Sequence, residues 1–375
     1  MVIAVNTRFL VNGEREDYAS FIHETFSRIT RSQPGHTFIF IFDRPPALSY
    51  IFPPNVVPVV TGPQARHPAQ WYIWYNIKVP AVLKRYKADV FVSPDGSCSL
   101  TARIPQCLVV YDLAFLQGAP FMARSHFLFY KKFTPRFIKK AAMVVTLSQF
   151  TRAAIVKYYK TGDDKIEVIY TGVTEKFISI SIEEREAVKT KYAGGNEYFI
   201  YSGDIVSDKN LVNLLKAFSA FKKRQKSSMQ LVITGTPGWK YEEFLESLRL
   251  FRFRDDVKLL ANPSPADLIE ITAAAYAMVY PSLPRDIGTQ ALQAMKSGVP
   301  VITSPATAIS EICGDAALYA DPDNFKEIAV QMMLIFKDEN LRSTLIEKGK
   351  LLAEGYGWNK TAGLFWNVIA KTMKR

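Results

Sequence analysis

The loop that follows the short apolar run 198–202 has residue types suited to an anionic ligand. Gly203 lets a ligand approach the backbone closely, because glycine has no side chain in the way. Lys209 places a cation at the entry to the next amphipathic stretch, where the N–H groups of a helix start already favour an anion. This spacing predicts a grip for a diphosphate. The alternative is an exposed lysine beside a capping aspartate.

Two further loops of the second half follow apolar runs in the same way. The turn at Gly235 can admit a nucleotide, although such a turn is also typical of an ordinary chain reversal. A third loop turns at Gly288, and a helix is predicted to begin near Thr289, where free N–H groups could hold a phosphate. Thr289 and Gln293 are four residues apart, share a helix face and could reach one ligand. The alternative is an ordinary helix start with threonine as its polar cap.

Twelve short apolar runs supply the strands that must position these loops. Continuous apolar runs without strict alternation indicate parallel strands that are covered on both faces. Two successive series of such runs predict an α/β fold of two Rossmann-like, doubly wound domains. The runs are 2–5, 37–42, 56–60, 89–93, 108–111 and 143–147 in the first half, and 198–202, 230–234, 257–260, 277–280, 299–303 and 317–320 in the second.

The boundary between the domains is expected within 171–197, which gives an N-terminal domain over 1–175 and a C-terminal domain over 176–360. A charged helix over 179–193 is predicted to end at Gly194. Ser148 is predicted to cap a helix over 149–159 rather than to act as a nucleophile. The last segment, 361–375, has four apolar residues near one face. We expect it to pack back on the N-terminal domain.

Two segments of the first half carry aromatic and basic residues at helical spacing. Within 69–87, the cluster of Trp71, Tyr72, Trp74 and Tyr75 indicates core packing more than a platform for stacking sugars. Over 123–142, an apolar stripe lies beside a stripe of four cations, and Pro135 predicts a kink or a break. This second pattern favours a helix whose apolar side packs on the core and whose basic side faces solvent. A helix that lies on a membrane surface is the alternative.

Charge and composition narrow the partners. The chain holds 47 Lys/Arg against 35 Asp/Glu, and the excess lies over 1–170, with 21 against 11. This balance suggests an anionic partner, but no recognition motif for nucleic acid accompanies it. Three cysteines and four scattered histidines show no metal-ligand spacing, so no metal or cofactor is expected. Without a signal-peptide pattern or a spanning apolar run, we expect a cytoplasmic protein, and peripheral contact with the acidic inner face of a membrane stays open.

Taken in order, these segments resemble glycosyltransferase family 4, the retaining enzymes with the GT-B fold, in which two Rossmann-like domains face a central cleft. The resemblance covers nearly the whole chain and is most specific over 109–115, 144–150, 168–173, 201–215, 279–303 and 314–322. It implies an acceptor-side N-terminal domain and a C-terminal domain that binds a nucleotide sugar. The implied reaction transfers a hexose, without a metal, from a nucleoside diphosphate sugar to a glycan or lipid-linked acceptor in polysaccharide biosynthesis.

Several positions depart from the pattern that the family implies. Where the family has a Glu pair, this chain has Arg285 and Gln293. Where the family has a basic pair, this chain has Asp208 and Lys209, and Tyr111 replaces a His of the family. Gln293 can still bond ribose hydroxyls, whereas a guanidinium cannot accept a hydrogen bond. The catalytic candidates are Tyr111, Asp112, Lys209 and Arg285, and the donor-binding candidates are Gly203, Lys209, Gly235, Gly288, Thr289 and Gln293. The departures leave a second interpretation open, an impaired family member that acts as a binding or partner subunit.

Overall fold

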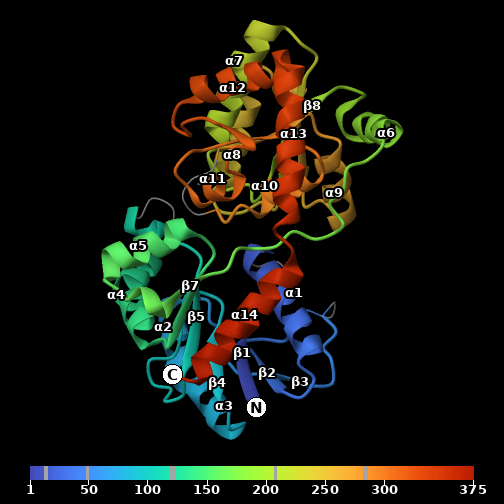
Figure 1. Cartoon of the computed structure of the whole chain (residues 1–375). Coiled ribbons are helices and arrows are strands. Elements are labelled where there is room, and N and C mark those ends of the chain that lie inside the picture. Colours follow the sequence, from blue (N-terminus) through green and yellow to red (C-terminus); the bar gives the residue numbers. More distant parts are fainter. Residues whose placement is uncertain (12–15, 48–49, 118–122, 207–208, 282–285) are drawn as a thin grey trace. The chain divides into compact units, whose positions relative to one another are not determined.

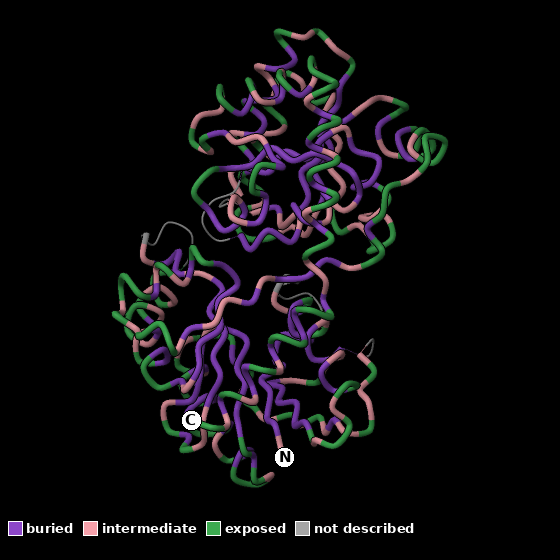
Figure 2. Tube along the Cα trace, in the orientation of Figure 1, coloured by how far each residue is buried: buried purple, intermediate pink, exposed green. Residues whose placement is uncertain are grey.

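A computed structural model describes residues 1–375 except 12–15, 48–49, 118–122, 207–208 and 282–285. The chain divides into two compact units (Figure 1). Unit 1 comprises Met1–Gly172 and Trp358–Arg375, and unit 2 comprises Val173–Gly357. Figure 2 shows that the strands of each unit are mostly buried, as parallel strands covered on both faces should be.

Unit 1 contains a seven-stranded parallel sheet in the order β3-β2-β1-β4-β5-β6-β7. The chain order therefore changes direction between β1 and β4. In an open α/β sheet, this switch point is where the loops at the carboxyl ends of the strands leave a crevice. The strands are β1 (Val2–Asn6), β2 (Thr37–Phe42), β3 (Val56–Val60), β4 (Val90–Ser93), β5 (Gln106–Val110), β6 (Met143–Thr146) and β7 (Ile166–Val168).

Helices cover both faces of the unit 1 sheet. Trp71, Trp74 and Phe137 belong to one apolar core with alternate strand residues, while α1 and the C-terminal α14 pack on the opposite face. Figure 1 shows α1 and α14 side by side, although they are far apart in the sequence. The helices are α1 (Glu16–Ser32), α2 (Pro68–Ile73), the π-helical turn η1 (Trp74–Lys78), α3 (Val79–Arg85), the 3-10 turn η2 (Ala114–Gln117), α4 (Arg124–Lys140), α5 (Gln149–Tyr159), the 3-10 turn η3 (Asp163–Lys165) and α14 (Trp358–Met373).

Unit 2 contains a six-stranded parallel sheet in the order β10-β9-β8-β11-β12-β13. Its switch point lies between β8 and β11. The strands are β8 (Tyr198–Ser202), β9 (Gln230–Gly235), β10 (Val257–Ala261), β11 (Ala277–Tyr280), β12 (Val301–Thr303) and β13 (Ala317–Tyr319). The helices are α6 (Ile182–Ala193), α7 (Leu211–Gln225), α8 (Tyr241–Arg249), the 3-10 turn η5 (Arg254–Asp256), α9 (Pro265–Ala273), α10 (Thr289–Lys296), α11 (Ala308–Cys313), α12 (Phe325–Lys337) and α13 (Glu339–Glu354).

Local signals set several helix ends as expected. The Ser148 hydroxyl accepts a hydrogen bond from the Thr151 amide at 3.1 Å, which confirms its capping role at α5. Gly194 ends α6 with a φ of 59°, in the left-handed region that glycine enters at little cost. The structure shows no break at Pro135, because α4 continues through it. The short strand β7 was not predicted.

Candidate functional site

The carboxyl ends of β8 and β9 in unit 2 approach each other at two glycines. Gly203 follows β8 with a φ of 149°, and Gly235 ends β9 with a φ of 150°. A Cβ on Gly235 would lie 1.8 Å from the carbonyl oxygen of Gly203, so no other residue fits there. A Cβ on Gly203 would lie 3.2 Å from the hydroxyl oxygen of Tyr201. Both predicted glycine loops therefore lie together at the same edge of the sheet.

Lys209 connects this edge with the loop after β11. Its ammonium forms an ion pair with Asp286 and lies 3.4 Å from the hydroxyl oxygen of Tyr280, the last residue of β11. The Lys209 side chain is 13% exposed, so the alternative of an exposed lysine is wrong. Asn210, rather than an aspartate, is the residue before α7. The cation therefore reaches across the switch point between β8 and β11, where ligands bind in such sheets.

Two stacked tyrosines lie next to Lys209 at the ends of β8 and β11. The rings of Tyr201 and Tyr280 stack with their centroids 5.3 Å apart, and the Tyr201 hydroxyl donates to the carbonyl oxygen of Asp204 at 2.9 Å. Burial raises the pKa of Tyr201 well above its ordinary value. This phenol therefore stays protonated at neutral pH and serves as a donor rather than as an acid or base.

The loop after β11 leads into α10 close to the Lys209 ion pair. Asp286 lies two residues before Gly288, which is the residue before α10 and has a φ of 82°. Gly288 is therefore the N-cap of α10, the position that the alternative interpretation gave to Thr289. Thr289 is instead the first residue of the helix and is buried. Gln293 follows one turn later and is half-buried. Arg285 and Asp208 lie outside the described residues.

Tyr111 and Asp112 of unit 1 follow β5 and are held by local contacts. The Tyr111 hydroxyl donates to the carbonyl oxygen of Pro94 at 3.2 Å, and its ring stacks on Tyr18 with centroids 3.8 Å apart. Asp112 accepts a hydrogen bond from the Ala114 amide at 2.8 Å. Tyr111 is therefore buried, and its side chain is held in place by these two contacts.

The switch point of unit 1 holds a buried cluster that the sequence analysis missed. Arg8, which follows β1, pairs its Nε with Asp95, which follows β4, at 2.6 Å. The Tyr75 hydroxyl also donates to Asp95, and Asn6 donates to the hydroxyl oxygen of Tyr75 at 3.0 Å. Burial raises the pKa of Tyr75, so it remains a donor toward the carboxylate. The sequence signal for this cluster is that Arg8 and Asp95 each lie just after a predicted apolar run.

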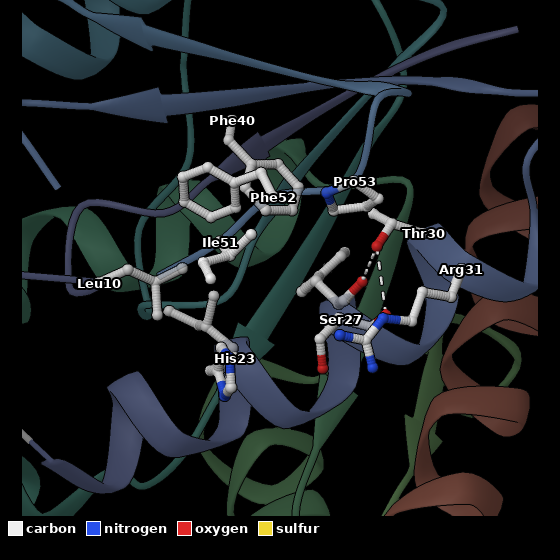
Figure 3. Close-up of a pocket in the computed structure, with 11 residues that line it drawn as sticks. Leu10, His23, Ser27, Thr30, Arg31, Phe40, Ile51, Phe52 and Pro53 are labelled. Atoms are coloured by element: carbon white, nitrogen blue, oxygen red, sulfur yellow. Dashed lines mark hydrogen bonds between the residues drawn. The ribbon is translucent and has the colours of Figure 1, made fainter. Parts of the chain in front are cut away.

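A cavity of about 30 Å³ in unit 1 lies between α1 and the 51–53 segment (Figure 3). Its walls include Leu10, Phe40 and Phe52, with His23 and Arg31 on α1. This volume suits about one water molecule and is too small for a sugar.

Metal-binding clusters and membrane-spanning helices are both absent from the described part of the chain. Among those residues, no group of three or more His, Cys, Asp or Glu could hold a metal ion. In the same residues, no helix combines the length and apolar character that crossing a bilayer requires.

Two family models match the chain. One, described as glycosyl transferases group 1, matches residues 182–352, and one, described as glycosyltransferase family 4, matches residues 29–177. The O-antigen chain mannosyltransferase B of Escherichia coli is 24% identical over 278 residues, which cover 74% of this chain and 72% of that protein. The O-antigen chain mannosyltransferase RfbU of Salmonella typhimurium is 27% identical over 281 residues, 73% of this chain and 72% of that protein.

Solved structures of the same architecture superpose on nearly the whole chain. Sucrose-phosphate synthase from Thermosynechococcus elongatus matches with a TM-score of 0.81 and 15% identity, over 99% of this chain and 98% of that one. HepE from Anabaena in complex with UDP-glucose matches with a TM-score of 0.77 and 15% identity, over 99% of this chain and 100% of that one. At this identity, the likeness shows the fold.

Proposed function

Since the chain belongs to glycosyltransferase family 4 and has the GT-B fold, we propose that it transfers a hexose, with retention, from a nucleoside diphosphate sugar. The proposed acceptor is a glycan or lipid-linked saccharide in polysaccharide biosynthesis, in line with the O-antigen mannosyltransferases that it resembles. The family uses nucleotide-sugar donors, and HepE is known in complex with UDP. We assign the donor to unit 2 and the acceptor to unit 1.

The main support for this proposal is that Lys209 lies beside the loop that leads into α10. The ion pair with Asp286 holds the Lys209 ammonium beside the loop that enters α10. A departing nucleoside diphosphate is an anion, and both a cation and the N–H groups of a first helical turn stabilise it. Removing one such stabilising contact commonly slows a reaction by ~10²–10³.

The remaining unit 2 candidates have supporting roles in the proposal. Gly203 and Gly235 keep the strand ends free of side chains, so that a nucleotide can approach the backbone. Thr289 and Gln293 lie on α10, and Gln293 supplies an amide that can bond ribose hydroxyls. We assign Arg285 a charge-stabilising role toward the leaving group, on the sequence alone.

In unit 1, Tyr111 and Asp112 are proposed as sugar-side residues. The Tyr111 hydroxyl is already bonded to the Pro94 carbonyl oxygen, which supports a positioning role for its ring rather than proton transfer. Asp112 caps the turn that begins at Ala114, and this contact fixes the direction of its carboxylate.

The same ion pair is the observation that favours the second candidate function, a partner subunit without turnover. Asp286 competes with any phosphate for the Lys209 ammonium, and a ligand must break a partly buried pair to bind. If the pair is too stable to open, the donor site is closed and the chain acts as a binding subunit in polysaccharide assembly.

Calorimetry on the full chain with UDP, GDP, ADP and dTDP distinguishes these two functions. We expect micromolar binding of at least one nucleotide, and Lys209→Ala should weaken it by about tenfold or more, which corresponds to about 1.4 kcal/mol. The matched control is Lys216→Ala, an exposed lysine on α7, which should leave the affinity unchanged.

A donor-hydrolysis assay on the same proteins then tests turnover. The native chain should release the nucleoside diphosphate from the donor that binds, and Lys209→Ala should slow this release by ~10²-fold. Binding of none of the four nucleotides would contradict the transferase proposal and favour the partner subunit.

A further inference from the structure

The loop that follows β9 in unit 2 carries an exposed tryptophan. Trp239 is 49% exposed, and it is the one tryptophan of the sequence between residues 173 and 357. The Lys240 ammonium lies 5.4 Å from the centre of the indole ring and pairs with Glu243 at 2.9 Å. The indole is therefore held by a local contact, while about half of its surface stays accessible to a ligand.

Backbone contacts join the Trp239 loop to the Lys209 loop. The Gly238 amide donates to the carbonyl oxygen of Ile205 at 3.2 Å. A Cβ on Gly238 would lie 2.5 Å from the Cγ1 of Val206, so the two loops pack closely at this point. The Lys209 amide in turn donates to the carbonyl oxygen of Val206 at 3.1 Å. These contacts hold Trp239 and Lys209 at the same edge of the sheet.

The strand order sets the spacing along this edge. In the order β10-β9-β8-β11, the Trp239 loop follows a strand two places from β11, and the loop after β11 carries Asp286 and leads into α10. Neighbouring strands lie about 4.8 Å apart, so this separation is roughly 10 Å. A nucleotide whose phosphates lie between Lys209 and the start of α10 can therefore extend along the edge and place its base over β9.

This position distinguishes Trp239 from other exposed apolar side chains. A single exposed aromatic residue is ordinary on a protein surface and implies no ligand by itself. Trp239, however, lies at the carboxyl ends of parallel strands, where such sheets bind their ligands. It is also joined by hydrogen bonds to the loop that ends at Lys209.

Asn262 supplies an amide next to the Trp239 loop. It follows β10 with a φ of 53°, and its backbone N–H donates to the carbonyl oxygen of Gly235 at 2.9 Å. Its side chain is exposed and forms no hydrogen bond with the residues that the structure describes. An amide offers a donor beside an acceptor, and the edge of a nucleobase presents the complementary pair.

We propose that Trp239 stacks on the base of the donor nucleotide and that the Asn262 amide pairs with the edge of that base. The indole accepts any base, because every base has an aromatic face. Trp239 therefore supplies affinity, whereas Asn262 influences which base is preferred. This inference rests on the proposed function, because it requires a nucleotide whose phosphates lie at Lys209.

Calorimetry that compares nucleotides with a ligand without a base tests the stacking contact. Trp239→Ala should weaken the binding of UDP, GDP, ADP or dTDP by about tenfold and leave the binding of inorganic pyrophosphate unchanged. Trp239→Phe keeps an aromatic ring and should restore most of the affinity. Leu250→Ala is the control, because this side chain is 89% exposed at the end of α8.

Indole fluorescence gives a second readout of the same contact. The other four tryptophans of the chain belong to unit 1, so Trp239 alone reports on unit 2. A nucleotide should quench the fluorescence of the native chain, because the base stacks on the indole. Trp239→Phe should still bind the nucleotide but should lose this quenching.

Asn262→Asp tests the edge contact. A carboxylate has no donor and pairs best with the two adjacent N–H donors of guanine, so the ratio of GDP affinity to UDP affinity should rise roughly tenfold. Aspartate enters the left-handed region much as asparagine does, so the loop should keep its conformation. The control, Asn340→Asp, adds the same charge at an exposed position of α13.

The possible outcomes separate this inference from the proposed function. Nucleotide binding that Trp239→Ala leaves unchanged, or that it weakens no more than pyrophosphate binding, would overturn the stacking contact. A ratio of GDP to UDP affinity that Asn262→Asp leaves unchanged would overturn the edge contact. If the native chain binds no nucleotide, the proposed function itself is contradicted, and this inference with it.

Discussion

Lys209 is the residue whose surroundings bear most directly on the proposed activity. Its partner Asp286 comes from the loop after a neighbouring strand, and both side chains are largely buried. A buried charge must be compensated, and Asp286 compensates the Lys209 ammonium. Under the proposed function, a donor phosphate would compete with this carboxylate for the ammonium. We therefore regard the ion pair as a competitor for the anion.

Replacing Asp286 tests that competition. Asp286→Asn should raise the affinity for the nucleoside diphosphate that binds by roughly tenfold, because the phosphate no longer displaces a carboxylate. Calorimetry measures the effect, and Asp255→Asn, an exposed aspartate of the same unit, is the control. An unchanged or weaker affinity would show that Asp286 positions Lys209 rather than competing with the ligand.

The three cysteines give a pH-dependent expectation. All are buried, and burial raises the pKa of Cys107 and of Cys313 to about 12 each, and that of Cys98 as well. The thiol pKa is thus higher in the folded chain than its unfolded value of about 8.5. The stability that this difference contributes is fully present below about pH 8.5. It is lost as the pH rises from about 8.5 toward 12, because the unfolded chain then loses protons that the folded chain keeps.

A thiol reagent at pH 8 should therefore leave the native chain unlabelled, because the thiolate is the reactive form. All three cysteines should react once the chain is unfolded in guanidinium, which serves as the control. Rapid labelling of the native chain would contradict the buried, protonated state of these thiols.

At the level of elements, the approach of β8 and β9 depends on two glycines. Their positive φ values and the near contact of Gly235 with the Gly203 carbonyl oxygen let both strand ends pass without side chains. The switch-point loops are thus shaped by backbone geometry as much as by functional groups. A side chain there would push apart the strand ends that position Lys209.

Gly235→Ala should destabilise the chain by at least ~2 kcal/mol, because the new methyl group meets a backbone oxygen and the φ disfavours an L side chain. Thermal melting measures the loss. The control is Gly363→Ala on the exposed face of α14, where nothing lies within 4 Å, and it should be neutral or stabilise by up to about 1 kcal/mol. Equal melting temperatures for the two variants would refute the role of the Gly235 turn.

At the scale of the whole molecule, the C-terminal helix completes unit 1. The α14 helix packs on α1, and the buried Phe365 ring lies 5.6 Å from the Phe26 ring and 6.0 Å from the Phe21 ring. The Thr361 hydroxyl also donates to the carbonyl oxygen of Tyr170 at 2.9 Å. Unit 1 therefore needs both ends of the chain for its core.

Phe365→Ala should cost ~3–5 kcal/mol, since it leaves a cavity between two helices and the sheet. Chemical denaturation followed by circular dichroism measures it. Leu364→Ala removes an exposed apolar side chain from the same helix and should change stability by no more than about 0.5 kcal/mol. A small loss for Phe365→Ala would mean that unit 1 does not depend on this helix.

The sequence by itself determined the features that arise from neighbouring residues. Apolar runs marked twelve of the thirteen strands found in the described residues, and local capping signals marked Ser148 and Gly194. Strand burial and helix ends depend on a few adjacent residues, so the sequence shows them. The three-residue β7 was too short to give such a pattern.

Only the tertiary structure decided which distant residues meet. Lys209 and Asp286 are 77 positions apart, and Arg8 and Asp95 are 87 apart. Each pair forms because the order of strands in the sheet brings two loops to one switch point, and no local pattern encodes that order. Tyr72 is 46% exposed and contacts Phe133 of α4, a placement that helical spacing alone did not predict.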